Sequence, residues 1–444
     1  MSRPYRILFA SPQTLFDVSN GASMQCYTMM QTLAAMGLRV ASLGGGIFDN
    51  PSGKNRIPNF EEQLEKNKKK EVLVNVDSSA SPENPIVHHF FTGFSHTAWD
   101  QMTYQEMNRF LNVYTKLLRK FKPDLVMGYG CDPLCRAMWA EAKFFGIPTV
   151  YVVCNGNHRH FRFPMHDLII CDSHATADYY KRQEGLTVHP VANFINPKLV
   201  VAPKRNPQAV TFINSDFAKG VAIVARLILM ANRERPDIPF LIVETRRKLK
   251  DALKALKVPG GKPGSAFQQQ SFRNIVIRPA QFDVKEIYRY TGVLLAPSLW
   301  YESWGRVATE AVMNGIPVLA SKSGGLPEAV GTGGITLDTP TECSGKPADW
   351  LTLPSEESCR PWADALYKLY DERTSALWEA RCKETAEHFS LAACGKRLLT
   401  LFDPLLERRA GDNDFTRMGS VRYDNDPLDW EEAGLLPRIV MPGQ

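Results

Sequence analysis

The sequence contains no long hydrophobic run. Nowhere among its 444 residues does a stretch approach the roughly 20 consecutive apolar residues that a membrane-spanning helix needs. The apolar run in the N-terminal MSRPYRILFASPQ is about four residues, too short for the core of a secretory signal peptide. We therefore expect a cytoplasmic protein that is soluble, or at most peripheral to the inner face of a membrane.

A cysteine framework is also missing. The nine cysteines are odd in number and scattered along the chain, so they do not form the pattern of a disulfide-rich domain. Cys131 and Cys135 form a lone pair with no second pair at zinc-ligand spacing. We expect free thiols in a reducing compartment, and no metal site.

The chain lacks a strong charge excess of either sign. Lys and Arg number 53 and Asp and Glu number 47, which gives a formal net charge of +6. No basic stripe interleaves with aromatic residues, so nucleic acid is not an expected partner. The modest positive charge fits an anionic small-molecule substrate or a weak attraction to an acidic membrane surface.

Hydrophobic periodicity predicts repeated strand–helix–strand units. An apolar strand at 6–10 is followed by a polar loop, a helical pattern over 22–37 and a second strand at 38–46. Repetition of this unit predicts a parallel sheet. The pattern restarts after 197–207, a stretch with three prolines that is typical of a linker.

Two such halves predict an α/β protein with two doubly wound domains facing each other across a cleft. The first domain is expected over 1–200, with a polar insertion at about 49–100 and a C-terminal segment at about 385–444 that rejoins it. The second domain is expected over 205–385. In such folds ligands bind at the carboxyl ends of the strands.

The stretch 298–321, SLWYESWGRVATEAVMNGIPVLAS, combines a loop, a helix and a strand after a predicted central strand. Gly305 lets backbone approach a ligand closely, and the free amides at the helix start can bind an anion. Glu302 and Glu310 are suited to accept hydrogen bonds from sugar hydroxyls. The same spacing also fits an ordinary helix with two glutamates, one placed near its N-terminus by the helix dipole.

This stretch resembles the donor-binding signature of retaining glycosyltransferases of family four, which have the two-domain GT-B fold. In that family a Glu-x7-Glu pair follows a strand ending in Pro-Ser, and further glycine and proline motifs come after it. The matching residues are Pro297, Ser298, Glu302, Gly305, Glu310, Gly315, Ile316, Pro317, Val318, Gly324, Gly325, Pro327 and Glu328.

The resemblance covers most of the chain. Asn20-Gly21 resembles the family's glycine loop, which faces the donor diphosphate, and Lys219-Gly220 resembles its phosphate-binding Lys-Gly. HDLIICDSHAT, at 166–176, resembles the family's Asp-(apolar)-Ser strand and helix start, and Asn193 resembles the Asn that closes the first domain. Lys219 by itself also fits a solvated lysine, but a helix start is unfavourable for a cation unless an anion is present.

The sequence departs from the family around the donor phosphates. Asn214 stands where the family has an Arg five residues before the Lys, so Arg246, Arg247 or Arg306 would have to supply that charge. Val-Glu-Thr-Arg at 243–246 replaces a Val-Gly-x-Gly turn. We expect a reshaped nucleotide pocket.

A second departure lies near the reacting sugar. Cys154 stands where the family often has a His, and the loop histidines His158 and His160 are the candidates to reach the site. A loop histidine is more often simply solvated. Two Asp-Asn-Asp triplets, at 412–414 and 424–426, mimic a metal motif of another glycosyltransferase fold. They lie in a polar tail outside any β-α-β unit, so we interpret them as solvated turns.

The resemblance implies a retaining glycosyltransferase that moves a sugar from a nucleotide-diphosphate sugar to a hydroxyl acceptor, without a metal or other cofactor. The predicted catalytic residues are Glu302 at the donor sugar, Lys219 at the leaving diphosphate, and His158. Glu310 would hold the ribose. The predicted donor-binding set is Asn20, Gly21, Lys219, Glu302, Gly305, Arg306, Val307 and Glu310.

Other functions stay open beside this one. The missing Arg and His favour a GT-B pseudoenzyme that binds nucleotide or glycan without turnover. A sugar phosphorylase or synthase would share the fold. A peripheral membrane contact would use the basic amphipathic helix at 246–257, with Leu249, Leu253 and Leu256 on one face, and the lysines of 66–70.

The acceptor is not identified by any motif, and a saccharide, a lipid-linked sugar and a peptide all stay open. The insertion at 49–100, which contains His88, His89 and His96, is the candidate for acceptor recognition. The alternative is a decorative surface insertion.

Overall fold

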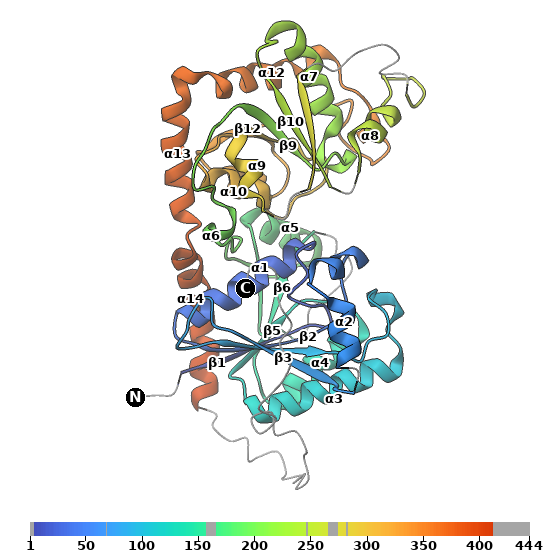
Figure 1. The fold of residues 1–444 in the computed structure, drawn as a ribbon. Helices are drawn as coiled ribbons and strands as arrows, with labels where there is room; N and C mark the ends of the chain where they lie inside the picture. The colour runs from blue at the N-terminus through green and yellow to red at the C-terminus, as the bar shows by residue number, and fades with distance from the viewer. Residues whose placement is uncertain are drawn as a thin grey trace.

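The structure is a computed structural model that describes residues 4–67, 69–156, 166–245, 247–264, 274–280 and 283–411. Two α/β domains follow each other along the long axis of the molecule, and each is built on its own sheet (Figure 1). The predicted fold class, two doubly wound domains, is confirmed.

The first sheet has eight strands in the order β3-β4-β2-β1-β5-β6-β7-β8. Its pairs are parallel except β3, which runs antiparallel to β4 at one edge. The strands are β1 (Arg6–Ala10), β2 (Arg39–Gly45), β3 (Val72–Asp77), β4 (Ile86–Phe91), β5 (Leu125–Gly128), β6 (Thr149–Val153), β7 (Leu168–Cys171) and β8 (His189–Pro190).

Helices cover both faces of this sheet, because its central strands are apolar on both sides. The helices are α1 (Gly21–Ala35), α2 (Phe60–Lys66), α3 (Tyr104–Phe121), α4 (Pro133–Phe144) and α5 (His174–Glu184). Local capping residues set the start of two of them. Thr103 and Glu106 form a capping box on α3, and Asp132 is the N-cap of α4, with Pro133 as its first helical residue.

The second sheet has six parallel strands in the order β11-β10-β9-β12-β13-β14. The strands are β9 (Ala209–Ile213), β10 (Phe240–Glu244), β11 (Ile275–Pro279), β12 (Thr291–Ala296), β13 (Val318–Ser321) and β14 (Gly334–Leu337). The helices are α7 (Val221–Glu234), α8 (Leu249–Ala255), α9 (Lys285–Tyr290), α10 (Arg306–Met313), α11 (Leu326–Val330), α12 (Glu356–Tyr370) and α13 (Ser375–His388).

The chain passes between the two domains twice. The short helix α6 (Pro197–Val200) lies between them, and α13 and α14 (Leu391–Gly411) run down one side of the molecule (Figure 1). Cys394, Leu398, Phe402 and Leu406 of α14 are buried in the same core as the apolar face of α1. The C-terminal helix therefore packs on the first sheet. The predicted boundaries at 200, 205 and 385 stay a prediction.

The stretch at 49–100 is not only the polar insertion that we predicted. It adds β4 and β3 to the sheet beside β2. His88 and His89 lie buried in β4, where the Ser42 hydroxyl is 2.7 Å from His88 Nδ1. Burial lowers the pKa of His89 to about 4. The two histidines can be buried in this strand because burying a neutral, hydrogen-bonded imidazole costs little free energy. They also interrupt the apolar pattern, so the sequence did not indicate the strand.

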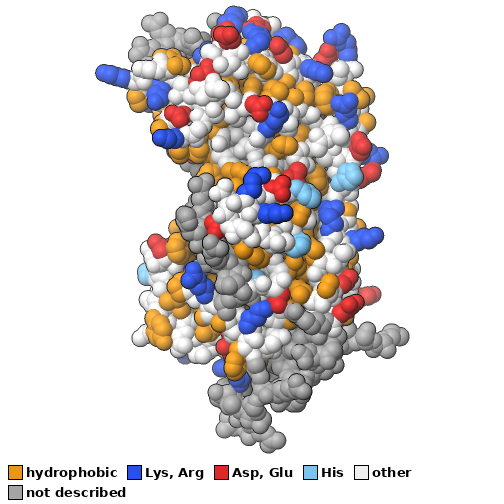
Figure 2. Space-filling view, turned by 180° about the vertical axis from the view of Figure 1, so that it is seen from behind, with side chains coloured by type: hydrophobic (Ala, Val, Ile, Leu, Met, Phe, Trp, Pro, Cys, Tyr) orange, Lys and Arg blue, Asp and Glu red, His pale blue; other side chains and the backbone are white. Residues whose placement is uncertain are grey.

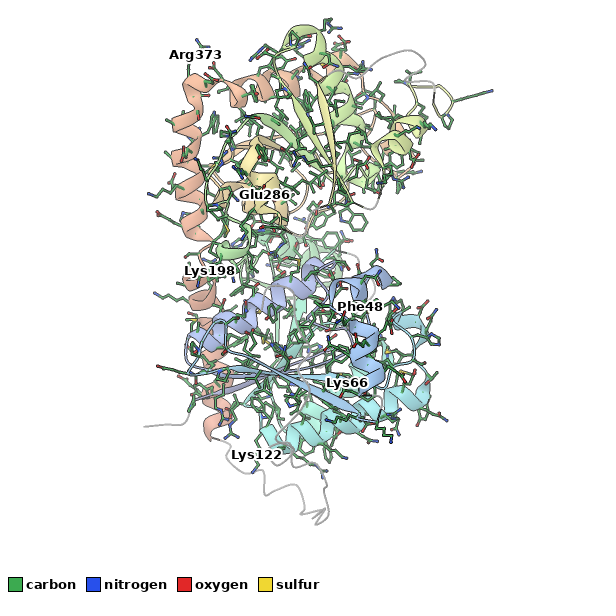
Figure 3. The ribbon with its side chains drawn as sticks, in the orientation of Figure 1. Phe48, Lys66, Lys122, Lys198, Glu286 and Arg373 are labelled. Carbon is green, nitrogen blue, oxygen red and sulfur yellow. The ribbon has the colours of Figure 1, made fainter. Side chains whose placement is uncertain are left out.

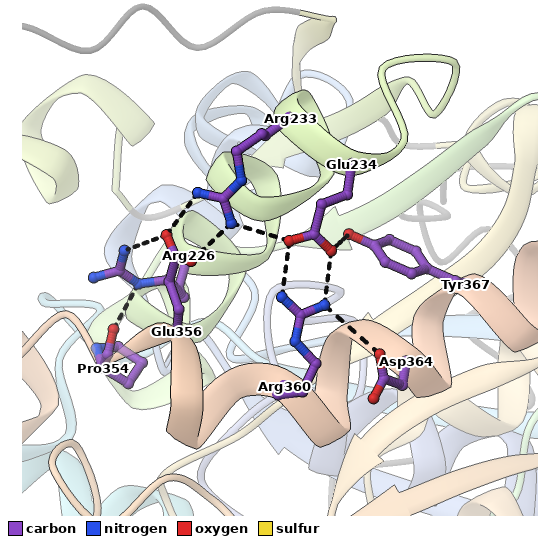
Figure 4. A network of polar contacts seen from close by, with 8 residues as sticks. All are labelled: Arg226, Arg233, Glu234, Pro354, Glu356, Arg360, Asp364 and Tyr367. Carbon is purple, nitrogen blue, oxygen red and sulfur yellow. Dashed lines mark hydrogen bonds and ion pairs between the residues drawn. The ribbon is translucent and has the colours of Figure 1, made fainter.

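An ion-pair network on the second domain joins α7 to α12 (Figure 4). Arg360 makes two hydrogen bonds to Glu234, of 2.7 and 2.8 Å, and Arg233 makes two to Glu356, of 3.0 and 2.7 Å. The network lowers the pKa of Glu234 to about 2, chiefly through Arg360. None of these residues belongs to the predicted site, so we assign the network to helix packing.

The basic helix that was considered for membrane contact is shorter than predicted, and its leucines face inward. Leu249 and Leu253 lie on α8, and Leu256 is the C-cap of this helix. All three pack against the core of the second domain. Lys66 lies on α2 in the other domain (Figures 1 and 3). No helix in the described part of the chain is long and apolar enough to cross a membrane.

Candidate active site

Two loops of the second domain meet at the carboxyl ends of β9 and β12. The loop after β9 ends at Gly220, whose φ is +84°, and a Cβ there would lie 2.0 Å from the carbonyl oxygen of Pro297. The amide of Leu299 donates to the Ala218 carbonyl at 2.9 Å. Glycine at 220 therefore permits the contact that places Lys219 beside the 298–305 loop.

Lys219 and Glu302 form an ion pair in this contact. The Ser298 hydroxyl donates to Glu302 Oε1 at 2.6 Å and holds the carboxylate in place. The Lys219 side chain is 36% exposed and that of Glu302 is 14% exposed. Lys219 is therefore not the freely solvated lysine that its position alone would allow.

Glu310 lies deeper, with its side chain 7% exposed. Its Oε1 is 2.7 Å from Nε of Arg306, one turn earlier on α10, and its Oε2 accepts a hydrogen bond from the Tyr288 hydroxyl at 2.7 Å. Both carboxylate oxygens thus have a protein partner. The sequence did not indicate Tyr288, because its contact depends on how α9 packs against α10.

The charge of Arg306 is paired with Glu310, but its guanidinium group is not fully hydrogen-bonded. Its side chain is 18% exposed, and its buried Nη1 atom has no hydrogen-bond partner among the described residues. A buried guanidinium nitrogen without a partner is costly, and an anion at the start of α10 would supply one. Gly305, with φ +106°, and Val307 flank Arg306 at this helix start.

Asn214 occupies the position at which the resembling family has an Arg, and its backbone lies in the left-handed region. Asn214 has φ +76°, and its Oδ1 is buried without a hydrogen-bond partner in the described part of the chain. Arg247 lies nearby, with its guanidinium 4.5 Å from the centre of the Phe217 ring and 3.5 Å from Asp216 Oδ2. Arg306 and Arg247 are therefore the described candidates to replace the missing charge.

On the first domain, Asn20 and Gly21 begin α1. Asn20 accepts a hydrogen bond from the Ala22 amide at 2.9 Å. The loop before it is fixed by the buried Asp17, which accepts from the amides of Ser19 and Asp49 at 2.9 Å each. Asp17 was not predicted, because its partner in the 49–100 stretch is distant in sequence.

A second buried carboxylate lies where the two domains meet. Asp172, directly after β7, accepts hydrogen bonds from the side chains of Gln25 and Asn193. Burial raises its pKa to about 7, although both hydrogen bonds and the charge of Arg306 act against the shift. Asn193 was predicted to close the first domain, and Asp172 is the residue it contacts.

Direct hydrogen bonds join the domains beside Glu302. The carboxylate of Glu328, on α11, accepts from the backbone amides of His174 and Ala175 at 2.8 Å each and so caps α5 of the other domain. The Ser303 hydroxyl donates to the Cys154 carbonyl at 2.8 Å. Cys154, which replaces the family's His, therefore lies next to the Glu302 loop.

A pocket of about 460 Å³ opens in the first domain next to Cys154 and Asn155. It lies at the carboxyl ends of the central strands, which is the usual position for a ligand site in this type of sheet. The side chains that shape it include Ser11, Asn20, Asp49, Trp99, Tyr129 and Asp132. Asp49 and Trp99 are the two ends of the stretch that we predicted to recognise the acceptor.

Some predicted residues lie outside the described residues. These are His158, His160, Arg246 and both Asp-Asn-Asp triplets. Within the described ranges, no group of three or more His, Cys, Asp or Glu side chains is arranged to hold a metal ion.

Positive and negative side chains are interspersed on the face shown in Figure 2.

The whole chain resembles solved structures of glycosyltransferases. A glycosyltransferase from Rickettsia africae aligns with a TM-score of 0.62 at 13% identity, over 91% of this chain and 100% of that one. Anabaena HepE in complex with UDP and glucose gives 0.56 at 14% identity, over 89% and 99%. The pneumococcal O-GlcNAc transferase GtfA in complex with UDP and GlcNAc gives 0.58 at 12% identity, over 91% and 100%. The protein has the GT-B fold.

Sequence comparison adds a family match over part of the chain. Residues 274–357, which contain Glu302 and Glu310, match the family described as glycosyl transferases group 1. D-inositol 3-phosphate glycosyltransferases are similar in part: that of Corynebacterium kroppenstedtii is 32% identical over 31% of this chain and 27% of its own length, and that of Corynebacterium efficiens is 26% identical over 46% and 49%. These matches span between about a quarter and a half of the curated relatives. The predicted relationship to GT-B glycosyltransferases is confirmed.

Proposed function

We propose that this protein is a retaining glycosyltransferase that uses a nucleotide-diphosphate sugar and a hydroxyl acceptor. The observation that carries the proposal is the ion pair of Lys219 with Glu302, in the loop that leads to the helix start where Arg306 pairs with Glu310. An anion there would receive two cations and the free amides at the start of α10. The names of the structural neighbours, which include UDP complexes, make a uridine diphosphate donor the first to test.

In the proposed reaction, the bond between the sugar's anomeric carbon and the β-phosphate oxygen breaks, and the acceptor oxygen bonds to that carbon on the same face. The acceptor's proton goes to the departing phosphate oxygen. Lys219, Arg306 and the amides at Gly305 and Val307 stabilise the charge on the leaving diphosphate. Asn20-Gly21 closes over the diphosphate from the first domain.

The two glutamates have different parts in this proposal. Donor binding would draw the Lys219 ammonium toward the phosphates and release Glu302 to accept from a sugar hydroxyl. Glu310 fixes Arg306 and keeps lone pairs for the ribose, since Tyr288 and Arg306 each use one oxygen. His158, which lies outside the described residues, stays the proposed catalytic group. Cys154 is unsuited as a nucleophile, because its contact with Cys26 and its burial raise the pKa of its thiol well above the usual value.

The proposed reaction uses no metal or other cofactor, because protein cations meet the diphosphate. Activity should therefore persist in the presence of EDTA. Binding is tested by thermal unfolding with UDP, GDP, ADP and CMP. A ligand at about 100 times its Kd should add roughly 2.7 kcal/mol to the free energy of unfolding. Lys219→Ala should lose this stabilisation. Lys322→Ala, whose lysine pairs with the exposed Asp338, should keep it.

A binding module without turnover is the second candidate. Its support is specific: Asn214 replaces a phosphate-binding Arg, and both oxygens of Glu310 already have protein partners. It predicts nucleotide binding that Lys219→Ala abolishes, with no consumption of any nucleotide sugar. A phosphorylase or synthase would instead release nucleotide or sugar phosphate only when phosphate or a free sugar is added.

A further inference from the structure

Arg247 lies beside the turn that carries Lys219, and we infer that it binds the phosphates of the donor together with that lysine. The inference rests on the proposed function and adds a residue to its donor site. The sequence left Arg246, Arg247 and Arg306 open as substitutes for the missing family Arg. The contacts of Arg247 within the fold single it out for this position.

The order of the second sheet brings Arg247 to the same edge as Lys219. β9 lies between β10 and β12, and the three strands are parallel. Lys219 follows β9, Glu302 follows β12 and Arg247 follows β10. The loops after β9 and β10 are joined where they start, because the Asn214 amide donates to the Val243 carbonyl at 2.9 Å. All three side chains therefore come from the carboxyl ends of adjacent strands, where ligands bind in such sheets.

The guanidinium group of Arg247 is held by contacts that leave most of its donors unused. Its carbon lies 4.5 Å from the centre of the Phe217 ring, and Phe217 begins the 3-10 turn that ends at Lys219. Its Nε lies 3.5 Å from Asp216 Oδ2, and its two Nη groups have no partner among the described residues. The side chain is 39% exposed, so a phosphate can reach a planar pair of N–H donors that suits bidentate contact.

The backbone at Asn214 disfavours a cation on β9 itself. Its φ of +76° lies in the left-handed region, where an arginine would be strained and an asparagine is tolerated. Its Oδ1 and the hydroxyl of the fully buried Ser215 have no hydrogen-bond partner in the described part of the chain. No Lys or Arg stands between Asn214 and Lys219, so a second charge at this turn has to come from a neighbouring strand.

Asp216 would repel a phosphate if its charge were not balanced. Its Oδ1 accepts a hydrogen bond from the Ala218 amide at 3.0 Å, and its Oδ2 faces Arg247. The Nε side of Arg247 thus balances Asp216, while the Nη groups stay available for the donor. Arg306 is arranged alike on α10, with Nε at 2.7 Å from Glu310 and an Nη1 that has no partner among the described residues.

Binding of diphosphates tests the inference without knowledge of the sugar or the acceptor. The probes are UDP, GDP, ADP and inorganic pyrophosphate, titrated by calorimetry into the full chain. Arg247→Gln should raise the Kd of the diphosphate that binds by about tenfold or more, because it removes charge-assisted hydrogen bonds. Arg247→Lys keeps the charge but not the planar pair of donors, so its Kd should lie between those of the wild type and Arg247→Gln.

Two further variants separate a phosphate ligand from a residue that only holds the turn. Asp216→Asn breaks the same ion pair, keeps an acceptor for the Ala218 amide and leaves the guanidinium group intact. Lys248→Ala removes a neighbouring positive charge that is 68% exposed and pairs with Glu244. Because exposed ion pairs contribute little, both variants should bind the diphosphate within about twofold of the wild type.

Three results would overturn the inference: a wild-type Kd in Arg247→Gln, equal losses in Arg247→Gln and Asp216→Asn, or an equal loss in Lys248→Ala. Failure of the proposed function gives a different result. In that case the wild type binds a diphosphate and Arg247→Gln weakens it, but no nucleotide sugar is consumed. A wild type that binds none of the four probes would contradict both the inference and the proposed function.

Discussion

The residues of the proposed donor site differ in how far the sequence could identify them. Lys219 and Glu302 are 83 positions apart, and only the family resemblance suggested that they meet. Arg306 was a candidate from its place beside Gly305. Tyr288 carried no signal, and Asp172 lay in the 166–176 resemblance without a predicted role, because their contacts arise from the packing of elements that are distant in sequence.

Asp172 gives the protein a predictable dependence on pH. Its pKa is about 7 in the folded protein, against an ordinary value of 3.8. The folded state therefore keeps a proton that the unfolded state has released, and stability falls as the pH rises from about 4 to about 7. The slope should approach about 1.4 kcal/mol per pH unit in that window.

Asp172→Asn removes this titration and keeps the shape of the side chain. The free energy of unfolding in urea, measured from pH 5 to pH 8, should therefore fall more steeply for the wild type than for the variant, and the two curves should run parallel above about pH 7.5. Curves that stay parallel over the whole range would show that Asp172 is ionised in the folded protein throughout.

At the scale of elements, the pattern of apolar residues predicted most strands and helices of the second domain. β12, α10 and β13 lie where the 298–321 segment and its preceding strand indicated. The first domain was harder to predict past residue 49. β4 carries two histidines, so the alternation that signals a strand was hidden. β3 is moreover an antiparallel edge strand, outside the repeating unit.

The contact between the two donor-site loops makes a second prediction. Gly220→Ala would place a Cβ 2.0 Å from the Pro297 carbonyl oxygen and keep an unfavourable positive φ. Gly185 offers a matched control, because its φ is +66° and nothing lies within 4 Å of its Cβ position. Gly185→Ala should cost roughly 1–2 kcal/mol from backbone strain alone. Gly220→Ala should cost more and also weaken nucleotide binding.

Urea unfolding of both variants separates the two effects. The difference between them measures the close approach of the loops. Equal losses of stability, with nucleotide binding retained in Gly220→Ala, would mean that the loops do not need to touch for Lys219 to reach its position.

At the scale of the whole molecule, α13 and α14 run along one side of the two domains (Figure 1), and Glu328 of the second domain accepts hydrogen bonds from α5 of the first. In the proposed reaction, closure of the two domains would exclude water from the donor. Glu328, from the Gly-Gly-x-Pro-Glu motif, caps α5 across the cleft and so fixes the Ser303–Cys154 contact beside it. In the sequence this motif indicated only a donor site. The contact of its Glu328 with the other domain could not be predicted, because His174 and Ala175 are distant in sequence.

Glu328→Ala should free the amides of His174 and Ala175. Loss of a helix cap costs about 1 kcal/mol, and we expect faster amide hydrogen exchange at the start of α5 and in the 298–305 loop. Glu357→Ala, on an exposed glutamate in the first turn of α12, should change neither segment. Unchanged exchange at α5 in Glu328→Ala would mean that this cap does not hold the domains together.

The central claim is that Lys219 stabilises a departing nucleoside diphosphate. The most direct measurement is the rate at which wild type, Lys219→Ala and Lys322→Ala release that diphosphate from the nucleotide sugar that binds. We predict turnover by the wild type and by Lys322→Ala, and a loss of about 100-fold or more in Lys219→Ala. A donor that binds at Lys219 but is never consumed, or a Lys219→Ala rate equal to that of the wild type, would contradict the account.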